Sequence, residues 1–230
     1  MLNVLLAGAS RGIGLGLVRA YLERGDRVFA VARNPASSAG LTELAAQHGA
    51  RLQLIACDLN APAAAATIRA ALGETRLDRL LLNAGVAGPA AQDVASVSEA
   101  EIAQLFLSNA IAPLRLARAL AAQLNTDAVV ACTSSVMASL QLSPGADLPL
   151  YAASKAALNS LLLSWVAQLG AARDFSLLAL HPGWVQTDMG GAQAPLSVAQ
   201  SVNGLVPVIE AAAGRRDCRF VDYQGQELPW

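Results

Sequence analysis

Two residues with acid–base side chains, Tyr151 and Lys155, lie four positions apart in the segment YAASK. On a helix this spacing places both side chains on one face, one turn apart. A protonated lysine close to a phenol favours the phenolate, so we expect Lys155 to lower the pKa of Tyr151 from about 10 toward the working range. An interfacial tyrosine beside an ordinary helical lysine has the same spacing, and the pair therefore needs further support.

A glycine-rich turn, GASRGIG at 8–14, follows a strand-like run and precedes a helical one. Glycines at such a junction let the backbone approach a pyrophosphate, and the helix N-terminus offers free N–H groups. The spacing is G-x-x-x-G-x-G, which differs from the G-x-G-x-x-G of many dinucleotide-binding turns. The turn predicts a dinucleotide site made by Gly8, Ser10, Arg11, Gly12, Ile13 and Gly14.

The end of the second strand-like run favours NADP(H) over NAD(H). Many NAD-binding sheets place a carboxylate there, about 20 residues after the glycine turn, to hold the ribose 2′-hydroxyl. This chain has Arg33 and Asn34 at that place and no carboxylate. The Arg33 guanidinium can pair with a 2′-phosphate, and Arg11 can add a second cation. The alternative is that Arg33 is a solvated loop residue.

Asn109 stands in the apolar helical stretch IAQLFLSNAIAPLRLA, and Pro113 follows it. Because asparagine is a poor helix former, we expect a locally opened turn here that orders a water between Lys155 and solvent. The alternative is a buried asparagine whose amide is satisfied by backbone groups.

The composition restricts the class of protein. Of 230 residues, 54% are hydrophobic, 14% charged and 4% aromatic, which predicts one domain over 1–230 with a buried parallel sheet under Ala-rich helices. The net charge of -1 indicates neither a nucleic-acid partner nor an anionic membrane surface. The start MLNVLLAGAS has no basic region and no long apolar run occurs, so we expect a soluble cytoplasmic protein with no membrane partner.

Metal and thiol chemistry are not indicated. No His, Cys, Asp and Glu cluster has metal-ligand spacing, and no metal is predicted. The cysteines Cys57, Cys132 and Cys218 are far apart, which is typical of inert buried thiols. His181 is expected to be a packed strand residue rather than a base.

The elements that position these residues alternate along the chain. Strand-like runs occur at 2–8, 27–32, 51–57, 77–83, 127–134, 175–181 and 218–223, and helical stretches at 13–24, 40–48, 61–72, 98–124, 150–170 and 197–213. This alternation predicts an α/β fold, a doubly wound (Rossmann) seven-stranded parallel sheet with helices on both faces in a three-layer sandwich. The loops 34–40, 85–98, 141–149 and 183–197 follow strands and should line the ligand crevice.

Taken in chain order, these motifs resemble those of the short-chain dehydrogenase/reductase family over essentially the whole chain. The glycine turn, Asn109, Tyr151 and Lys155 match family motifs in type and order. The remaining matches are Asp58-Leu59, the N-A-G turn Asn83-Ala84-Gly85, the serine Ser135, and Pro182-Gly183 through Val185 to Thr187. Within the family, HPGWVQTDMGG and YAASKAALN are similar to the C-factor and sniffer-type carbonyl reductase branch.

The resemblance implies an NADP(H)-dependent oxidoreductase that transfers hydride between nicotinamide and a carbonyl or alcohol. Tyr151 would supply the proton, Lys155 would hold the nicotinamide ribose, and Ser135 would polarise the carbonyl. Asn109 completes the catalytic set. Ser134 is the alternative to Ser135, because the two serines are adjacent and the gap from Ser135 to Tyr151 is longer than usual in the family. Further cofactor contacts are implied for Asp58, Leu59, Asn83, Ala84, Gly85, Pro182, Gly183, Val185 and Thr187.

The substrate is expected to lie between 136–149 and 184–196, against Met137, Trp184 and Met189. Neither loop contains Arg or Lys, so a small apolar aldehyde or ketone fits better than an anion.

Alternative functions and assembly remain open. A dinucleotide-binding signalling or regulatory protein of the C-factor type, with little catalysis, is the second interpretation. Extended-branch epimerases carry a larger C-terminal region, and enoyl reductases space their Tyr and Lys by seven. Apolar residues on more than one stripe of 98–124 and 150–170, such as Leu158, Leu161, Leu162 and Trp165, fit a homodimer, with a monomer as the alternative.

Overall fold

The computed structural model describes residues 1–142, 147–170 and 173–230, and within them it contains a seven-stranded sheet with strand order β3-β2-β1-β4-β5-β6-β7. The strands are β1 (Asn3–Ala7), β2 (Arg27–Ala32), β3 (Leu52–Ala56), β4 (Leu77–Leu82), β5 (Leu124–Thr133), β6 (Ser176–His181) and β7 (Cys218–Asp222). All neighbouring strands in this order pair in parallel. The order reverses between β1 and β4, and ligands bind doubly wound sheets at such a switch point.

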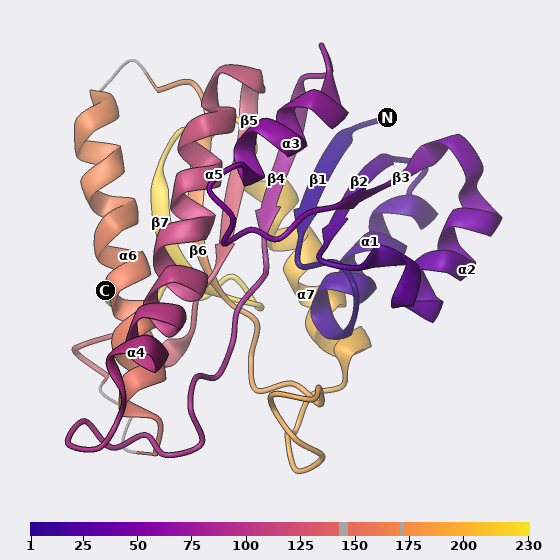
Figure 1. Cartoon of the computed structure of the whole chain (residues 1–230). Coiled ribbons are helices and arrows are strands. Elements are labelled where there is room, and N and C mark those ends of the chain that lie inside the picture. Colours follow the sequence, from indigo (N-terminus) through magenta and orange to yellow (C-terminus); the bar gives the residue numbers. More distant parts are fainter. Residues whose placement is uncertain (143–146, 171–172) are drawn as a thin grey trace.

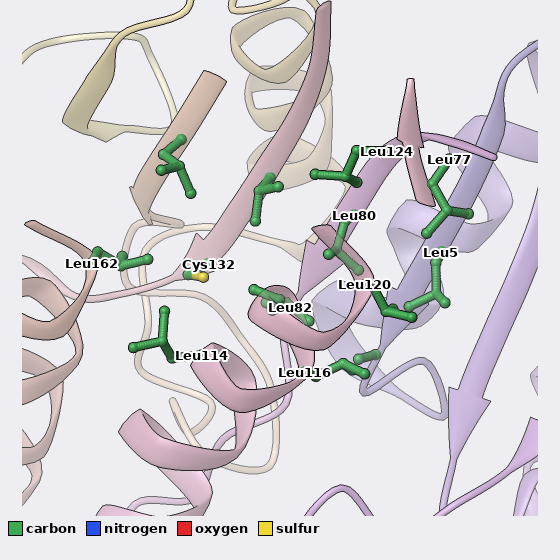
Figure 2. Packing of buried hydrophobic residues seen from close by; sticks show 14 of the residues in the cluster. Leu5, Leu77, Leu80, Leu82, Leu114, Leu116, Leu120, Leu124, Cys132 and Leu162 are labelled. Atoms are coloured by element: carbon green, nitrogen blue, oxygen red, sulfur yellow. The ribbon is translucent and has the colours of Figure 1, made fainter. Parts of the chain in front are cut away.

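Helices cover both faces of the sheet, as the sequence predicts (Figure 1). They are α1 (Gly12–Glu23), α2 (Ala39–His48), α3 (Ala64–Leu72), α4 (Glu99–Phe106), α5 (Ala112–Leu120), α6 (Pro149–Leu169) and α7 (Val198–Ala211). One core cluster joins the sheet to α3, α5 and α6, and the other joins it to α1, α2 and α7. In Figure 2, Leu120 of α5 lies close to the strand residues Leu5 and Leu80 within this first cluster. The three-layer sandwich is thereby confirmed.

The stretch 98–124, predicted as one helix, is divided. A π-helical turn over Leu107–Ile111 separates α4 from α5, and a short 3₁₀ turn over Ala121–Gln123 follows α5. The N–H of Ala112 bonds to the carbonyl of Leu107, five residues back, so the helix widens around Asn109. The local opening expected at Asn109 is present. The predicted end at 124 is wrong, because Leu124 already pairs with Leu77 as the start of β5.

By length and composition alone, the helical region Glu99–Gln123 could cross a membrane. Half of its most apolar window is buried inside the protein. Ala110, Leu114, Leu116 and Leu120 in this region belong to the core cluster beneath the sheet. Core helices of globular proteins pass the same test, so this feature does not change the prediction of no membrane partner.

The apolar side chains on which the homodimer prediction rests lie mostly inside the protomer. Leu158, Leu162 and Trp165 are buried in the core, and Leu161 packs against it. They are explained by the fold, and the homodimer therefore loses that support and stays a prediction.

Candidate active site

The predicted catalytic residues meet at the carboxyl edge of the central strands. Tyr151 is in the first turn of α6, and Lys155 follows one turn later, with its Nζ 5.8 Å from the centre of the Tyr151 ring. The connections after β4 and after β6 run at this same end, which is the lower end of the molecule in Figure 1. The 85–98 and 183–197 loops therefore lie where a ligand crevice is expected. The part of the predicted 141–149 loop at 143–146 lies outside the described residues.

Burial controls the ionisation of both residues. Lys155 is only 2% exposed, and its ammonium donates to the Thr133 carbonyl at 2.8 Å. Burial lowers the pKa of Lys155 to about 8. Burial also raises the pKa of Tyr151 to about 12, with a hydrogen bond to Ser135 acting in the opposite direction. The expected lowering of the Tyr151 pKa by Lys155 is wrong, because the cost of removing the phenolate from water outweighs the effect of the hydrogen bond to Ser135.

The two adjacent serines point to different partners. Ser135 is extended, its Oγ accepts from the Met137 N–H at 3.2 Å, and its side chain hydrogen-bonds Tyr151. Ser134 is 1% exposed, and its Oγ donates to Oδ1 of Asn159 at 2.7 Å. Successive side chains on extended backbone point to opposite sides, which separates the two hydroxyls. Ser135 is thus the serine on the Tyr151 side.

Asn109 is fully buried in the π-helical turn. Its Oδ1 accepts from the Val86 N–H at 2.8 Å, and its Nδ2 donates to the Val86 carbonyl and to Ser154 Oγ, each at 2.9 Å. This is the backbone-satisfied arrangement that the sequence left as an alternative. A methyl group at Gly85 would lie 3.3 Å from both Asn109 Oδ1 and Lys155 Nζ, so these two groups face the N-A-G turn together. The ordered water remains a prediction.

Asn83 connects the glycine turn to β5, the strand whose Thr133 carbonyl accepts a hydrogen bond from Lys155. Its Nδ2 donates to the Gly8 carbonyl at 3.1 Å, and its Oδ1 accepts from Thr133 Oγ1 at 3.1 Å. Thr133 in turn offers its carbonyl to Lys155. The described partners of the Asn83 side chain are thus protein groups, which position the two halves of the site relative to each other.

Gln92, in the loop after β4, is a site residue that sequence reasoning missed. Its Oε1 accepts from the backbone N–H of Tyr151 at 3.1 Å, and its Nε2 donates to the carbonyls of Pro89 at 2.8 Å and Ala87 at 3.2 Å. The residue at the N-cap of α6, Leu148, has no capping side chain. Gln92 satisfies a free N–H of the first helical turn from 59 residues away in sequence, and no local pattern reveals that contact.

The glycine turn packs as a phosphate-binding turn must. Gly8 has φ +89°, and a methyl group there would lie 2.6 Å from the Ala84 nitrogen. A methyl group at Gly14 would collide with the Gly8 carbonyl. Helix α1 begins directly after Arg11 with no side-chain cap and no acidic residue in its first turn. Its first N–H groups and its positive end are thus available to a pyrophosphate, so the residues present fit a dinucleotide.

The cations predicted for the 2′-phosphate lie beside this turn. Arg33 is exposed at the end of β2, in the loop that leads to Ser38. Ser38 Oγ donates to the carbonyl of Ser10 at 2.6 Å, which joins that loop to the glycine turn. Arg11 Nη1 pairs with Asp188 Oδ2 at 2.6 Å. At the adenine side, Asp58 is exposed and accepts from the Asn60 N–H at 3.0 Å, with Leu59 half-buried next to it.

The segment after β6 folds back on itself beside the glycine turn. The Pro182 carbonyl accepts from Ser201 Oγ at 2.6 Å, and Val185 pairs with Leu196. A methyl group at Gly12 would lie 3.1 Å from Cγ2 of Thr187, so Thr187 contacts the turn. Gly183 has φ +83°, the left-handed region.

The predicted substrate residues are accessible and apolar. Trp184 is 56% exposed, Met189 is 51% exposed and Met137 is half-buried. The indole of Trp184 donates to the Gly190 carbonyl at 2.8 Å, which fixes the ring against its own loop.

Among the residues that the structure describes, none of the remaining titratable candidates hydrogen-bonds to Tyr151, Ser135 or Lys155, although Cys132 lies close enough to Lys155 to influence its pKa. Burial lowers the pKa of His181 to about 4, so it is neutral at physiological pH. In the described ranges, no three His, Cys, Asp or Glu side chains gather as metal ligands, and the absence of a metal stays a prediction. The three cysteines are free thiols, and burial raises the pKa of Cys132 to about 12.

Comparisons of the sequence and of the fold with those of known proteins point to the same protein family. The family model described as short chain dehydrogenase matches residues 2–195. A crystal structure of a carbonyl reductase from Pseudomonas aeruginosa PAO1 in complex with NADP is 56% identical, covers 100% of both chains and has a TM-score of 0.94. Carbonyl reductase Sniffer of D. melanogaster is 29% identical, with a TM-score of 0.89 and 100% of both chains covered. The protein C-signal of Myxococcus xanthus is 40% identical over 156 residues, 67% of this chain and 93% of that protein.

Proposed function

Because the chain belongs to the short-chain dehydrogenase/reductase family, and so is an oxidoreductase acting on C=O and CH–OH groups, we propose that it is an NADP(H)-dependent carbonyl reductase for small apolar aldehydes or ketones. The observation that carries this proposal is that Tyr151, Ser135 and Lys155 lie together, while helix α1 begins after the glycine turn with no side-chain cap on its first N–H groups. The NADP complex of the 56% identical carbonyl reductase supports the choice of cofactor.

Each residue has a defined task in the proposed reaction. When bound, NADPH supplies the hydride that reaches the carbonyl carbon. The first N–H groups of α1 hold the diphosphate, and Arg33 pairs with the 2′-phosphate. Lys155, fixed by the Thr133 carbonyl, holds the nicotinamide ribose. Ser135 donates to the substrate oxygen, and Tyr151 gives its hydroxyl proton to that oxygen as it becomes an alkoxide.

The ionisation of the site supports the reductive direction. With a pKa of about 12, Tyr151 carries its proton at neutral pH, and carbonyl reduction needs this form. Lys155, with a pKa of about 8, can restore the proton near physiological pH. The exposed apolar side chains of Trp184 and Met189 favour a neutral substrate over an anionic one.

The proposal is tested with the purified chain, NADPH or NADH, and a panel of aldehydes, ketones and diketones, followed at the nicotinamide absorbance. We expect turnover with NADPH, and a loss of about 10²- to 10⁴-fold in Tyr151→Phe with NADPH binding retained. Tight NADPH binding without turnover on any carbonyl would contradict the proposal. That outcome would favour the signalling interpretation, which the similarity to C-signal supports.

The choice of serine has a matched pair of variants. Ser135→Ala should lower kcat on the order of 10²-fold, because the substrate oxygen loses a donor. Ser134→Ala removes only the bond to Asn159, so it should leave kcat within a few-fold and cost about 1 kcal/mol of stability. A larger loss of kcat in Ser134→Ala would reverse the assignment.

A further inference from the structure

An exposed ion pair crosses from the glycine turn to the segment after β6. Nη1 of Arg11 lies 2.6 Å from Oδ2 of Asp188, and the two side chains are 75% and 72% exposed. Across the described ranges, neither side chain has another hydrogen-bond partner. The pair therefore engages the one cation of the glycine turn, and it does so from the segment after β6.

The turn lies between two loops, and this determines what Arg11 can reach. On one side, Ser38 of the loop that follows Arg33 donates to the Ser10 carbonyl at 2.6 Å. On the other side, Thr187 contacts Gly12. Arg11 stands between these contacts, next to the Arg33 loop where the 2′-phosphate is expected and next to Asp188.

We propose that Asp188 reduces the preference for NADP(H) over NAD(H) by holding Arg11 in an ion pair that competes with the 2′-phosphate of NADP(H). The inference rests on the NADP(H) use proposed above. A phosphate carries more charge than a carboxylate and offers several oxygens to a guanidinium, so it displaces Asp188 when NADP(H) binds. NADH carries only a hydroxyl there and leaves the pair in place. The cost of breaking the pair therefore falls on NADPH alone.

The size of the effect follows from exposure. Exposed ion pairs are weak and screened by salt, so Asp188→Asn should tighten NADPH binding by about two- to five-fold. NADH affinity should stay unchanged. The gain should shrink at high ionic strength, where the competing pair is already screened in the native chain.

The experiment is a double-mutant cycle on NADPH and NADH affinity, measured by nicotinamide fluorescence in the native chain, Asp188→Asn, Arg11→Met and the double variant. Because the competition acts through Arg11, Asp188→Asn should have no effect on NADPH affinity in the Arg11→Met background. Glu74→Gln, an exposed site between α3 and β4, is the control for losing one negative charge and should change neither affinity.

Three results overturn the inference while leaving the proposed function intact. Weaker NADPH binding in Asp188→Asn would mean that the pair closes over the cofactor and helps to retain it. Equal tightening of NADPH and NADH that persists without Arg11 would mean plain repulsion of the diphosphate by Asp188. No change in NADPH affinity would mean that the pair is too weak to compete. A native chain that binds neither nucleotide overturns the proposed function and this inference with it.

Discussion

Burial is the dominant influence on the ionisable side chains at the centre of the site. The sequence spacing predicted that Tyr151 and Lys155 share a helix face, and they do. It predicted the wrong direction for the Tyr151 pKa, because desolvation depends on the surrounding loops and strands rather than on the helix. The partners of Asn109, Ser134 and Asn83 were unpredictable for the same reason, since each is a contact between distant segments.

The pH profile of carbonyl reduction should report Lys155. Reduction needs protonated Tyr151, whose pKa of about 12 keeps it protonated throughout the accessible range. Lys155 has a pKa lowered to about 8, so raising the pH through that value removes its charge. We therefore expect kcat to be flat below about pH 8 and to fall above it, measured with saturating NADPH between about pH 6 and about pH 10. A fall already complete below pH 7 would contradict this assignment.

At the scale of elements, the sequence predicted the order and type of the strands and helices but not where one helix ends and another begins. Apolar runs and glycine turns are local signals, so they located the sheet and α1. The opening at Asn109 was predicted from its poor helix propensity, whereas the end of α5 was misplaced because pairing of Leu124 with Leu77 overrides the helical pattern. The start of α6 depends on Gln92, which lies in a different loop.

Gln92 should therefore position Tyr151. Gln92→Met keeps a similar volume but removes all three hydrogen bonds, so we expect about a ten-fold loss of kcat with NADPH affinity unchanged. Gln92→Glu keeps the acceptor for the Tyr151 N–H and loses only the donors to Pro89 and Ala87. Its kcat should therefore lie between those of Gln92→Met and the native chain. Steady-state kinetics and NADPH titration provide the test. Identical kcat values in the two variants would mean that Gln92 acts only by ordering its own loop, and that its bond to the Tyr151 N–H does not matter for catalysis.

At the scale of the whole molecule, a buried polar network fixes one helical layer to the sheet. Arg79 of β4 donates to both carboxylate oxygens of Glu210 in α7, at 3.0 and 2.8 Å, and Tyr21 of α1 donates to the same carboxylate at 3.0 Å. The alternation of runs predicted helices on both faces of the sheet, and α1 and α7 pack on the same face. It could not predict a partner for an arginine inside the apolar run LDRLLL, because Glu210 is 131 residues away.

The network gives a prediction about global stability. The side chains of Arg79 and Glu210 are only 6% and 22% exposed, so Glu210→Met should leave a buried cation unpaired and cost about 3–5 kcal/mol. Arg79→Met/Glu210→Met removes both charges from the same interior, and we expect it to be more stable than either single variant. Urea unfolding of the native chain, the two single variants and the double variant measures the coupling. If the double variant loses as much as the two single variants combined, the charges do not depend on each other, and α7 is held to the sheet by its apolar contacts instead.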